Sequence, residues 1–373
     1  MVVIIPTLPR DICNYKFLSV FEVLLRFGNE YMGSAVECIA GPKARNHWLR
    51  MLTSSFILFQ IRVPFKKHLK IQNFTFGNTP CRLYSPVDVK SKACIIFIHG
   101  GGWCLMNAKY FDYIMSAIVK DLGCSILSID YGLAPRNVFP VGLNQCWVAI
   151  EDFYLNHADN LSIDKTRLAI LADSAGGNIA GALAQRSARL GKNYFKCQIL
   201  VYPITSCLDF QNSSYKEYYE KYNKTGLLNP EGVARWMLFY LGIEATKENV
   251  KKVMRNQHIS DKLRQDFNLK SECKHQVDLK LSEKFEEFAR NPDFCILKSK
   301  DLRLLPKTLV ITAGYDICFE ESYEYYCAMK SEGVQATWKH FPTAFHGILN
   351  LAGSQTQKAV KREITDYIRK NLF

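Results

Sequence analysis

A serine stands at a strand-to-helix junction of the sequence, where its hydroxyl could act as a nucleophile. Ser174 lies within Ala-Asp-Ser-Ala-Gly at 172–176, directly after an apolar run and before a helical pattern. A tight turn there would lift the hydroxyl above the sheet, and the following helix would offer the free N–H of Ala175 to an oxyanion. Small neighbours suit a strained turn. They also suit an ordinary loop with a serine cap, so this motif alone leaves both interpretations open.

Consecutive glycines follow an earlier apolar run, in the order His99-Gly100-Gly101-Gly102-Trp103. Glycine lets the chain turn sharply and brings bare backbone N–H groups close to a bound anion. A loop of this kind after the third strand matches the second half of an oxyanion hole. We therefore expect Gly101 and Gly102 to donate to an oxyanion. His99 and Gly100 are expected to be structural, with His99 bracing the loop rather than acting as a base.

Two further residues could complete a proton relay with Ser174. Asp316 and His346 each follow an apolar strand-like run, so both lie where open α/β sheets hold their ligands. The order Ser, Asp, His is that of α/β-hydrolases. His346 would take the serine proton and Asp316 would hold the imidazole, which predicts hydrolytic acyl transfer without a cofactor or metal. Three carboxylates are rivals for the acid: Asp130, Glu320 and Glu321.

Strand-like and helical patterns alternate along the chain. This alternation predicts an α/β-hydrolase fold with a mostly parallel eight-stranded sheet flanked by helices. The expected strands cover 69–76, 81–84, 93–98, 125–129, 167–171, 198–202, 308–312 and 334–340, the first two as a hairpin. The helical patterns cover 110–121, 141–157, 175–189, 230–240, 320–331 and 357–370.

The alternation is interrupted between residues 205 and 305, where the sequence is mostly helical, charged and aromatic. We expect this insertion to form a helical cap, with residues 1–68 contributing to it and 69–204 plus 306–373 forming the core. Aromatic residues in this region are candidates for an apolar acyl pocket, and the sequence does not separate them from cap core: Phe210, Tyr215, Tyr218, Tyr219, Tyr222, Trp236, Phe239 and Tyr240.

The net charge of +13 raises the question of an anionic partner. The basic stretches at 43–50, 62–70 and 247–255 accompany no recognisable nucleic-acid module, so no nucleic acid is expected. A modest attraction to a membrane surface stays open, because Phe56, Ile57, Leu58 and Phe59 lie beside the first two stretches. No cluster of cations converges near the motifs in sequence, which favours a neutral apolar ester or amide as the substrate.

The remaining signals concern the compartment. No apolar stretch is long enough for a membrane-spanning helix. The 13 cysteines show no zinc spacing, so no structural metal site is expected, and Cys104 and Cys318 are one conceivable disulfide pair in an oxidising compartment. Four N-x-[ST] sequons, at Asn73, Asn160, Asn212 and Asn223, are compatible with a glycoprotein.

Taken together, these motifs resemble the arylacetamide deacetylase group of the hormone-sensitive-lipase-type esterases. The matches are His-Gly-Gly-Gly-Trp at 99–103, Asp-Ser-Ala-Gly-Gly at 173–177, Tyr-Gly-Leu-Ala-Pro at 131–135 and Phe-His-Gly at 345–347, with residues 214–240 similar to the cap. The resemblance covers residues 60–373. It implies hydrolysis of acyl esters, acetamides or lipid esters, and a place in the lumen or membrane of the endoplasmic reticulum or in secretion.

The chain departs from that family in four ways. Ala172 replaces the usual glycine of the serine turn, Thr343-Ala344 replaces Asp-Gly, and Gly132 and Arg136 replace Arg and Glu. An N-terminal anchor is not seen, because the chain starts where we expect such a segment to have ended. An alternative therefore stays open, a weak or inactive member of the fold that binds a hydrophobic small molecule, with Ala172 as its best argument.

Overall fold

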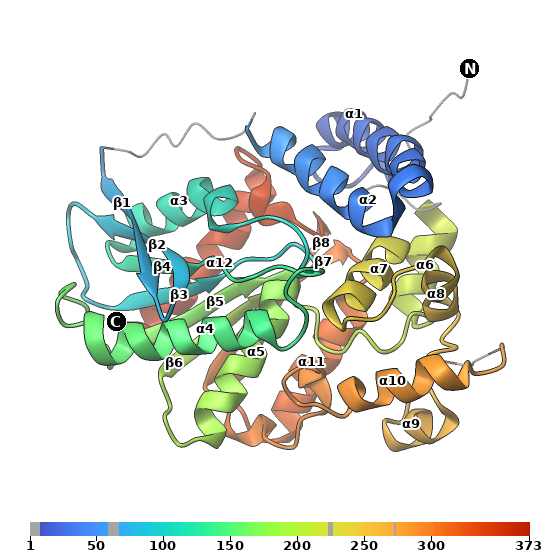
Figure 1. Ribbon diagram of the computed structural model, residues 1–373. Helices are drawn as coiled ribbons and strands as arrows, with labels where there is room; N and C mark the ends of the chain where they lie inside the picture. Colours follow the sequence, from blue (N-terminus) through green and yellow to red (C-terminus); the bar gives the residue numbers. More distant parts are fainter. Residues whose placement is uncertain (1–7, 59–66, 223–226, 272–273) are drawn as a thin grey trace.

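One mostly parallel sheet of eight strands runs through the described part of the molecule (Figure 1). The computed structural model describes residues 8–58, 67–222, 227–271 and 274–373, without the side chains of 55–58 and 218–222. The strand order is β1-β2-β4-β3-β5-β6-β7-β8, with β2 antiparallel to both of its neighbours and every other pair parallel. The strands are β1 Leu69–Phe76, β2 Thr79–Pro86, β3 Cys94–Ile98, β4 Ser125–Ile129, β5 Leu168–Asp173, β6 Phe195–Val201, β7 Lys307–Tyr315 and β8 Ala336–Phe345. The predicted sheet and its initial hairpin are confirmed.

Helices cover both faces of this sheet, which is why the central strands are apolar on both sides. One face packs against α3 (Asp112–Leu122) and α12 (Gln355–Leu372). The other packs against α4 (Val141–Asp152), α5 (Ser174–Arg189) and α11 (Phe319–Ser331). Every residue of β3 and β5 is buried as a result.

Two strands run further than the sequence pattern predicts. β7 continues three residues beyond the expected 312 and β8 five beyond 340, and their ladder reaches the pair Tyr315 and Phe345. The alternation in β8 is obscured because much of the strand is exposed. The consequence for the site is direct, since the chain leaves these strands immediately before Asp316 and His346.

Further helices lie at the carboxyl ends of the strands. α1 (Tyr15–Arg26) and α2 (Gly33–Leu58) lie beside α6 (Ser213–Tyr222), α7 (Pro230–Tyr240) and α8 (Lys247–Met254) in Figure 1. Glu37 of α2 forms ion pairs with Arg45 of the same helix at 2.7 Å and with Arg235 of α7 at 2.8 Å. The Arg50 guanidinium of α2 donates to the carbonyl oxygens of Cys104 and Ala134, both at 2.5 Å. The N-terminal helices are thus tied to α7 and to the loops above the sheet.

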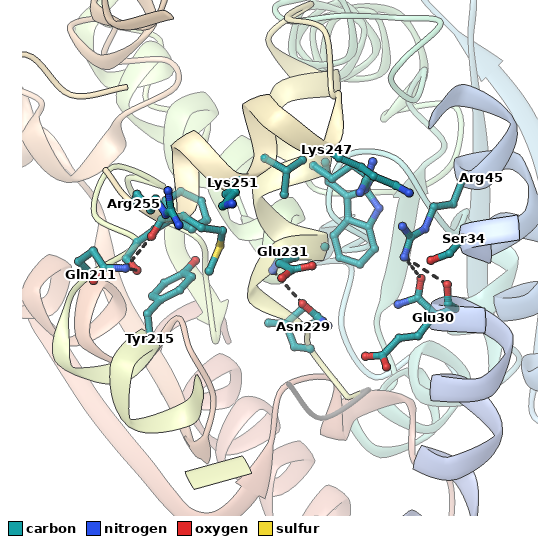
Figure 2. A pocket seen from close by; sticks show the side chains of 18 of the residues that line it. Glu30, Ser34, Arg45, Gln211, Tyr215, Asn229, Glu231, Lys247, Lys251 and Arg255 are labelled. Atoms are coloured by element: carbon teal, nitrogen blue, oxygen red, sulfur yellow. Dashed lines mark hydrogen bonds between the residues drawn. The ribbon is translucent and has the colours of Figure 1, made fainter. Parts of the chain in front are cut away.

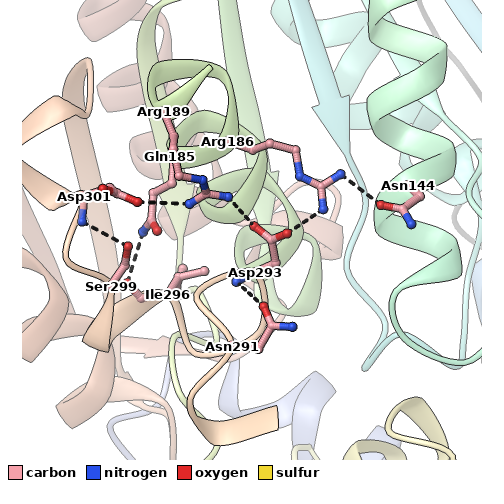
Figure 3. Close-up of polar contacts among 9 residues, drawn as sticks. All are labelled: Asn144, Gln185, Arg186, Arg189, Asn291, Asp293, Ile296, Ser299 and Asp301. Carbon is pink, nitrogen blue, oxygen red and sulfur yellow. Dashed lines mark hydrogen bonds and ion pairs between the residues drawn. The ribbon is translucent and has the colours of Figure 1, made fainter. Parts of the chain in front are cut away.

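The segment that returns from these helices to β7 is anchored along α5. It contains α9 (Asp261–Asp266) and α10 (Leu279–Ala289). Figure 3 shows Asp293 accepting hydrogen bonds from Arg186 at 2.5 Å and Arg189 at 3.1 Å, and Arg189 also pairs with Asp301 at 3.0 Å. The buried Gln185 amide donates to the carbonyl oxygen of Ile296 at 3.0 Å. The C-terminal half of α5 therefore holds residues 293–301 of this segment.

The described cysteines are all free. The conceivable pair of Cys104 and Cys318 is therefore wrong: the Cys104 thiol donates to the Trp236 carbonyl oxygen, whereas Cys318 lies beside Asp316. Burial raises the pKa of both thiols above the ordinary value.

Within the described ranges, no helix combines the length and the apolar character that crossing a membrane requires. Of the four sequon asparagines, Asn73 and Asn160 are exposed, Asn212 is half-buried and Asn223 lies outside the described residues.

Candidate active site

Ser174 occupies the sharp turn between β5 and α5. Its φ of 53° is in the left-handed region, which a non-glycine residue adopts only under strain. The turn is close-packed from below: a Cβ on Gly176 would lie 2.3 Å from the Ile98 carbonyl oxygen, so only glycine fits there. The first turn of α5 begins at Ser174, and the N–H groups of a first helical turn have no intrahelical acceptor. The N–H of Ala175, in this first turn, therefore has no acceptor within the helix.

The side chains of Ser174, His346 and Asp316 form a hydrogen-bonded row. His346 Nε2 lies 2.7 Å from Ser174 Oγ, and His346 Nδ1 lies 2.9 Å from Asp316 Oδ1. The backbone N–H of Cys318 donates to the same Asp316 oxygen at 2.8 Å, which orients the carboxylate. All three side chains are buried, so the row is shielded from bulk water. This geometry allows a proton to move from the hydroxyl to the imidazole while the carboxylate stabilises the resulting cation.

The three rival carboxylates contact other groups. Asp130 accepts from the N–H of Ala108 at 3.2 Å, and Glu320 accepts from the N–H of Ser214 at 3.3 Å. The buried Glu321 accepts from the backbone N–H of Thr205 at 3.0 Å and from the Ser206 hydroxyl at 2.8 Å. Glu321 thus fixes the start of the 205–305 segment.

The glycine loop lies over the serine in a conformation that other residues would not tolerate. Gly101 and Gly102 have φ of 114° and 59°, and a Cβ on Gly101 would lie 2.4 Å from the Leu105 carbonyl oxygen. The N–H of Gly100 donates to Asp173 Oδ1 at 2.8 Å, so the residue before the serine anchors the loop. Burial raises the pKa of Asp173 from 3.8 to about 6, although the Gly100 N–H opposes the shift.

His99 is fully buried beneath this loop, away from Ser174. Its Nδ1 lies 2.8 Å from the Gly100 carbonyl oxygen, and its ring stacks on Tyr131 with centroids 4.5 Å apart. The Tyr131 hydroxyl in turn donates to the His99 carbonyl oxygen at 2.9 Å. These contacts connect the glycine loop to the 131–135 segment that follows β4.

The roles of Asp173 and Tyr202 in the site were missed in the sequence, and Trp236 was named only as a candidate for the acyl pocket. Asp173 was read only as part of the serine motif, and its bond to Gly100 depends on a loop 73 residues away. Tyr202 packs its ring 4.7 Å from that of His346, and its hydroxyl accepts from the N–H of Leu349 at 3.3 Å. Trp236 lies against Gly102, where an added Cβ would meet its indole at 2.5 Å. An aromatic residue directly after β6 was the only available signal for Tyr202.

The row opens into a small apolar pocket of about 220 Å³. Gly101, Gly102, Ser174 and His346 line it, and its other walls come from α1, α2, α7 and the 345–351 segment. Of the cap aromatics predicted for an acyl pocket, Trp236 lines this pocket, whereas Phe239 and Tyr240 are buried in the core. The side chains of Tyr218, Tyr219 and Tyr222 lie outside the described residues.

A second cavity, of about 900 Å³, adjoins the first and contains the buried Phe210 and Tyr215 in its wall (Figure 2). Unlike the apolar pocket, this cavity is lined by many charged residues, of which seven are cationic and two are acidic. Arg45 of α2 faces Lys247 and Lys251 of α8 across it. The expectation that no cations converge near the motifs was wrong, because these residues come from separate segments of the chain.

Comparison with known proteins gives the family. A family model described as alpha/beta hydrolase fold matches residues 95–265 and 261–350. The chain belongs to the α/β-hydrolase fold family. It is 27% identical to the arylacetamide deacetylase of Rattus norvegicus over 390 residues, covering 98% of this chain and 95% of that protein. It is 30% identical to neutral cholesterol ester hydrolase 1 of Mus musculus over 308 residues, covering 75% of this chain and 74% of that protein.

Solved structures agree on the fold. A bacterial heroin esterase superimposes with a TM-score of 0.69 at 20% identity, covering 87% of this chain and 91% of its own. A thermostable esterase from Pseudomonas putida superimposes with a TM-score of 0.67 at 20% identity, covering 93% of this chain and 97% of its own. The resemblance to arylacetamide deacetylases and the hydrolase fold are thus confirmed, and the enzyme class of this α/β-hydrolase is that of carboxylic ester hydrolases.

Proposed function

We propose that this α/β-hydrolase cleaves esters or amides with an apolar acyl group through a covalent acyl-serine intermediate. The observation that carries the proposal is the row of 2.7 Å and 2.9 Å contacts through His346. In it, Ser174 is the nucleophile, His346 the general base and Asp316 the residue that orients the imidazole. The helices over the strand ends, from 1–68 and 205–305, serve as the cap.

The reaction follows from these positions. With Nδ1–H donating to Asp316, the neutral imidazole offers Nε2 to the serine proton as Oγ attacks the acyl carbon. The N–H groups of Gly101, Gly102 and Ala175 stabilise the oxyanion, each contributing about 2.7–4 kcal/mol to the lowering of the barrier. The imidazolium then gives its proton to the leaving alcohol or amine. Water, activated by the same imidazole, attacks the acyl-enzyme and releases the carboxylic acid.

The pocket indicates a short acyl group. Its volume of about 220 Å³ is below the roughly 300–1,000 Å³ of sites for drug-sized ligands. Its walls are mostly apolar, from Phe21, Leu49, Val233 and Leu351 among others. We therefore expect p-nitrophenyl esters of short acids to be hydrolysed faster than those of long-chain acids.

Labelling with a fluorophosphonate tests the nucleophile. The wild-type protein should gain one phosphonyl group in its intact mass, and Ser174→Ala should gain none and lose at least about 10³-fold in kcat toward p-nitrophenyl butyrate. Ser128→Ala is the matched control, because Ser128 is a buried serine of β4 whose hydroxyl has no hydrogen-bond partner among the described residues. Folded wild-type protein without label or turnover would instead favour a module that binds a hydrophobic small molecule.

We also propose that the enzyme associates with an anionic membrane surface. The residues first suggested for this, Phe56 to Phe59, have no described side chains, but α1 offers a better candidate. Val20 and Leu24 are 64% and 52% exposed on the outer side of that helix, whereas Phe17, 49% exposed, also lines the pocket. Leu18 and Leu25, on its other side, line the pocket over Ser174. An apolar substrate could therefore pass from a membrane to the serine along one helix.

A further inference from the structure

The large cavity and the reaction pocket share one wall. Trp236, Leu227, Leu228, Leu49 and Asn29 line both spaces. Trp236 also touches Gly102 of the glycine loop, so the indole stands between the expected oxyanion position and the cavity. A substrate whose acyl group occupies the apolar pocket would extend its other half past this indole.

The charge of the cavity is unbalanced. Lys247, Lys251 and Arg255 are spaced four residues apart, so they share one face of α8 and its end. Four lysines of the lining have no carboxylate within ion-pair distance among the described residues: Lys216, Lys247, Lys251 and Lys274. Across the cavity, Arg45 and the buried Arg235 both pair with the carboxylate of Glu37, and Glu30 and Glu231 are the two acidic residues of the lining.

The polar atoms without partners in this wall are all donors. Arg45 Nε, Tyr215 Oη and Trp236 Nε1 are buried and make no hydrogen bond within the described part of the chain. Each of these atoms has almost no accessible surface, so a ligand in the cavity meets the lysine side chains rather than these atoms. Figure 2 shows the Tyr215 hydroxyl directed toward the space below α8. The excess of cationic over acidic lining residues selects an anion with several acceptor oxygens.

We infer that the second cavity binds a phosphate monoester, and that the substrate is an amphiphile with an apolar acyl group at one end and a phosphate at the other. A phosphate carries about −1.5 to −2 charges at pH 7 and three strong acceptor oxygens, which match this donor set better than a carboxylate does. The substrate assignment rests on the proposed hydrolase function; the phosphate site itself does not. A substrate with a phosphate group replaces the neutral substrate that was expected from the sequence.

Equilibrium binding tests the site without turnover. Isothermal titration of the Ser174→Ala protein should give at least tenfold tighter binding of octyl phosphate than of octanol, and sodium chloride should reduce the difference. Lys247→Gln/Lys251→Gln should abolish it. Lys280→Gln/Lys284→Gln, which removes the same charge from an exposed face of α10, should leave it intact. Equal affinity for both ligands, or an equal loss in the control variant, would overturn the phosphate site.

Turnover then tests the substrate class. The kcat/KM for 1-octanoylglycerol 3-phosphate should exceed that for 1-octanoylglycerol at least tenfold. Lys247→Gln/Lys251→Gln should remove this preference, whereas Lys280→Gln/Lys284→Gln should keep it. Absence of all ester hydrolysis with octyl phosphate still bound would refute the proposed function and leave the phosphate site standing. Hydrolysis of both glycerides at equal kcat/KM would refute the substrate class alone.

Discussion

Ala172 is the residue at which this serine turn departs most visibly from the usual glycine. It is fully buried in β5 and pairs in register with Ile98 of β3 and Leu200 of β6. The methyl group therefore lies in a regular ladder, and the hydrogen-bonded row through His346 forms beside it. Ala172 removes nothing that the proposed chemistry requires.

Replacement of Ala172 by glycine should accordingly weaken the fold more than the activity. We expect Ala172→Gly to lower the free energy of unfolding by about 1 kcal/mol, because glycine loses more backbone entropy in a strand and leaves a small void. We expect kcat/KM for p-nitrophenyl butyrate to stay within about threefold. Urea unfolding and steady-state kinetics on the same preparation measure both. A tenfold rise in kcat would mean instead that the methyl group impairs turnover.

Asp173 makes the stability of the protein depend on pH. Burial raises its pKa from 3.8 to about 6, so the folded protein binds a proton more tightly at this carboxyl than the unfolded chain does. Its contribution is therefore full below pH 4 and is lost as the pH rises to about 6, by up to about 1.4 kcal/mol for each pH unit. Asp173→Asn cannot titrate and lacks this component.

The comparison of these two proteins gives the test. The free energy of unfolding of wild type minus that of Asp173→Asn should fall by on the order of 2–3 kcal/mol between pH 4 and pH 6.5. Urea titrations at half-unit pH intervals would show it, because other titrating groups cancel in the difference. A difference that is flat across this window would mean that burial does not raise the pKa of the Asp173 carboxyl.

At the scale of elements, α5 does more than present Ser174 at its N-terminus. Asp293 connects the C-terminal half of α5 to the 291–301 segment. Its carboxylate pairs with both Arg186 and Arg189, and its side chain is only 16% exposed (Figure 3). Removing the carboxylate leaves two partly buried guanidinium groups facing an amide. A charge shared between two partners is expected to contribute more than an exposed pair does.

Asp293→Asn should therefore lower the free energy of unfolding by about 1–2 kcal/mol and reduce the melting temperature measurably. Asp159→Asn is the matched control, since Asp159 pairs with Lys165 at an exposed site and should show no change in the same thermal scans. Activity per folded molecule should remain near the wild-type value in both. Equal melting temperatures for the two variants would show that the Figure 3 contacts add no stability.

The order of strands and helices could be predicted from sequence because each central strand is apolar on both faces and is bounded by glycine or polar residues. The ends of the strands could not be predicted. The last residues of β7 and β8 are extended because the two strands pair with each other, and their sequence does not alternate between apolar and polar residues there. For the site, motif order was sufficient to name Ser174, Asp316 and His346. The Asp173 anchor and the basic cavity arise from contacts between distant segments, which no local pattern encodes.

For the whole molecule, the proposed membrane association depends on where α1 lies. The exposed apolar residues Phe17, Val20 and Leu24 of α1 follow a helical spacing that continues to Phe27, directly after the helix, and Lys16 is exposed beside them. A net charge of +13 favours an anionic surface, and apolar side chains that enter the interface would add to that attraction. Because the inner side of α1 lines the reaction pocket, docking would set the pocket entrance against the lipid.

Flotation with phosphatidylserine-containing vesicles tests this arrangement. Wild-type protein should float with them and bind neutral phosphatidylcholine vesicles more weakly, and 1 M salt should reduce the difference because it screens the charges. Val20→Ser/Leu24→Ser should weaken partitioning at least tenfold, since transferring such side chains into an apolar phase is worth about 1.5–3 kcal/mol each when complete. Leu155→Ser/Leu190→Ser removes residues of similar exposure, 64% and 56%, away from α1 and should have no effect. If both double variants bind as wild type does, α1 is not the docking helix, and the charge alone would have to account for any binding that remains.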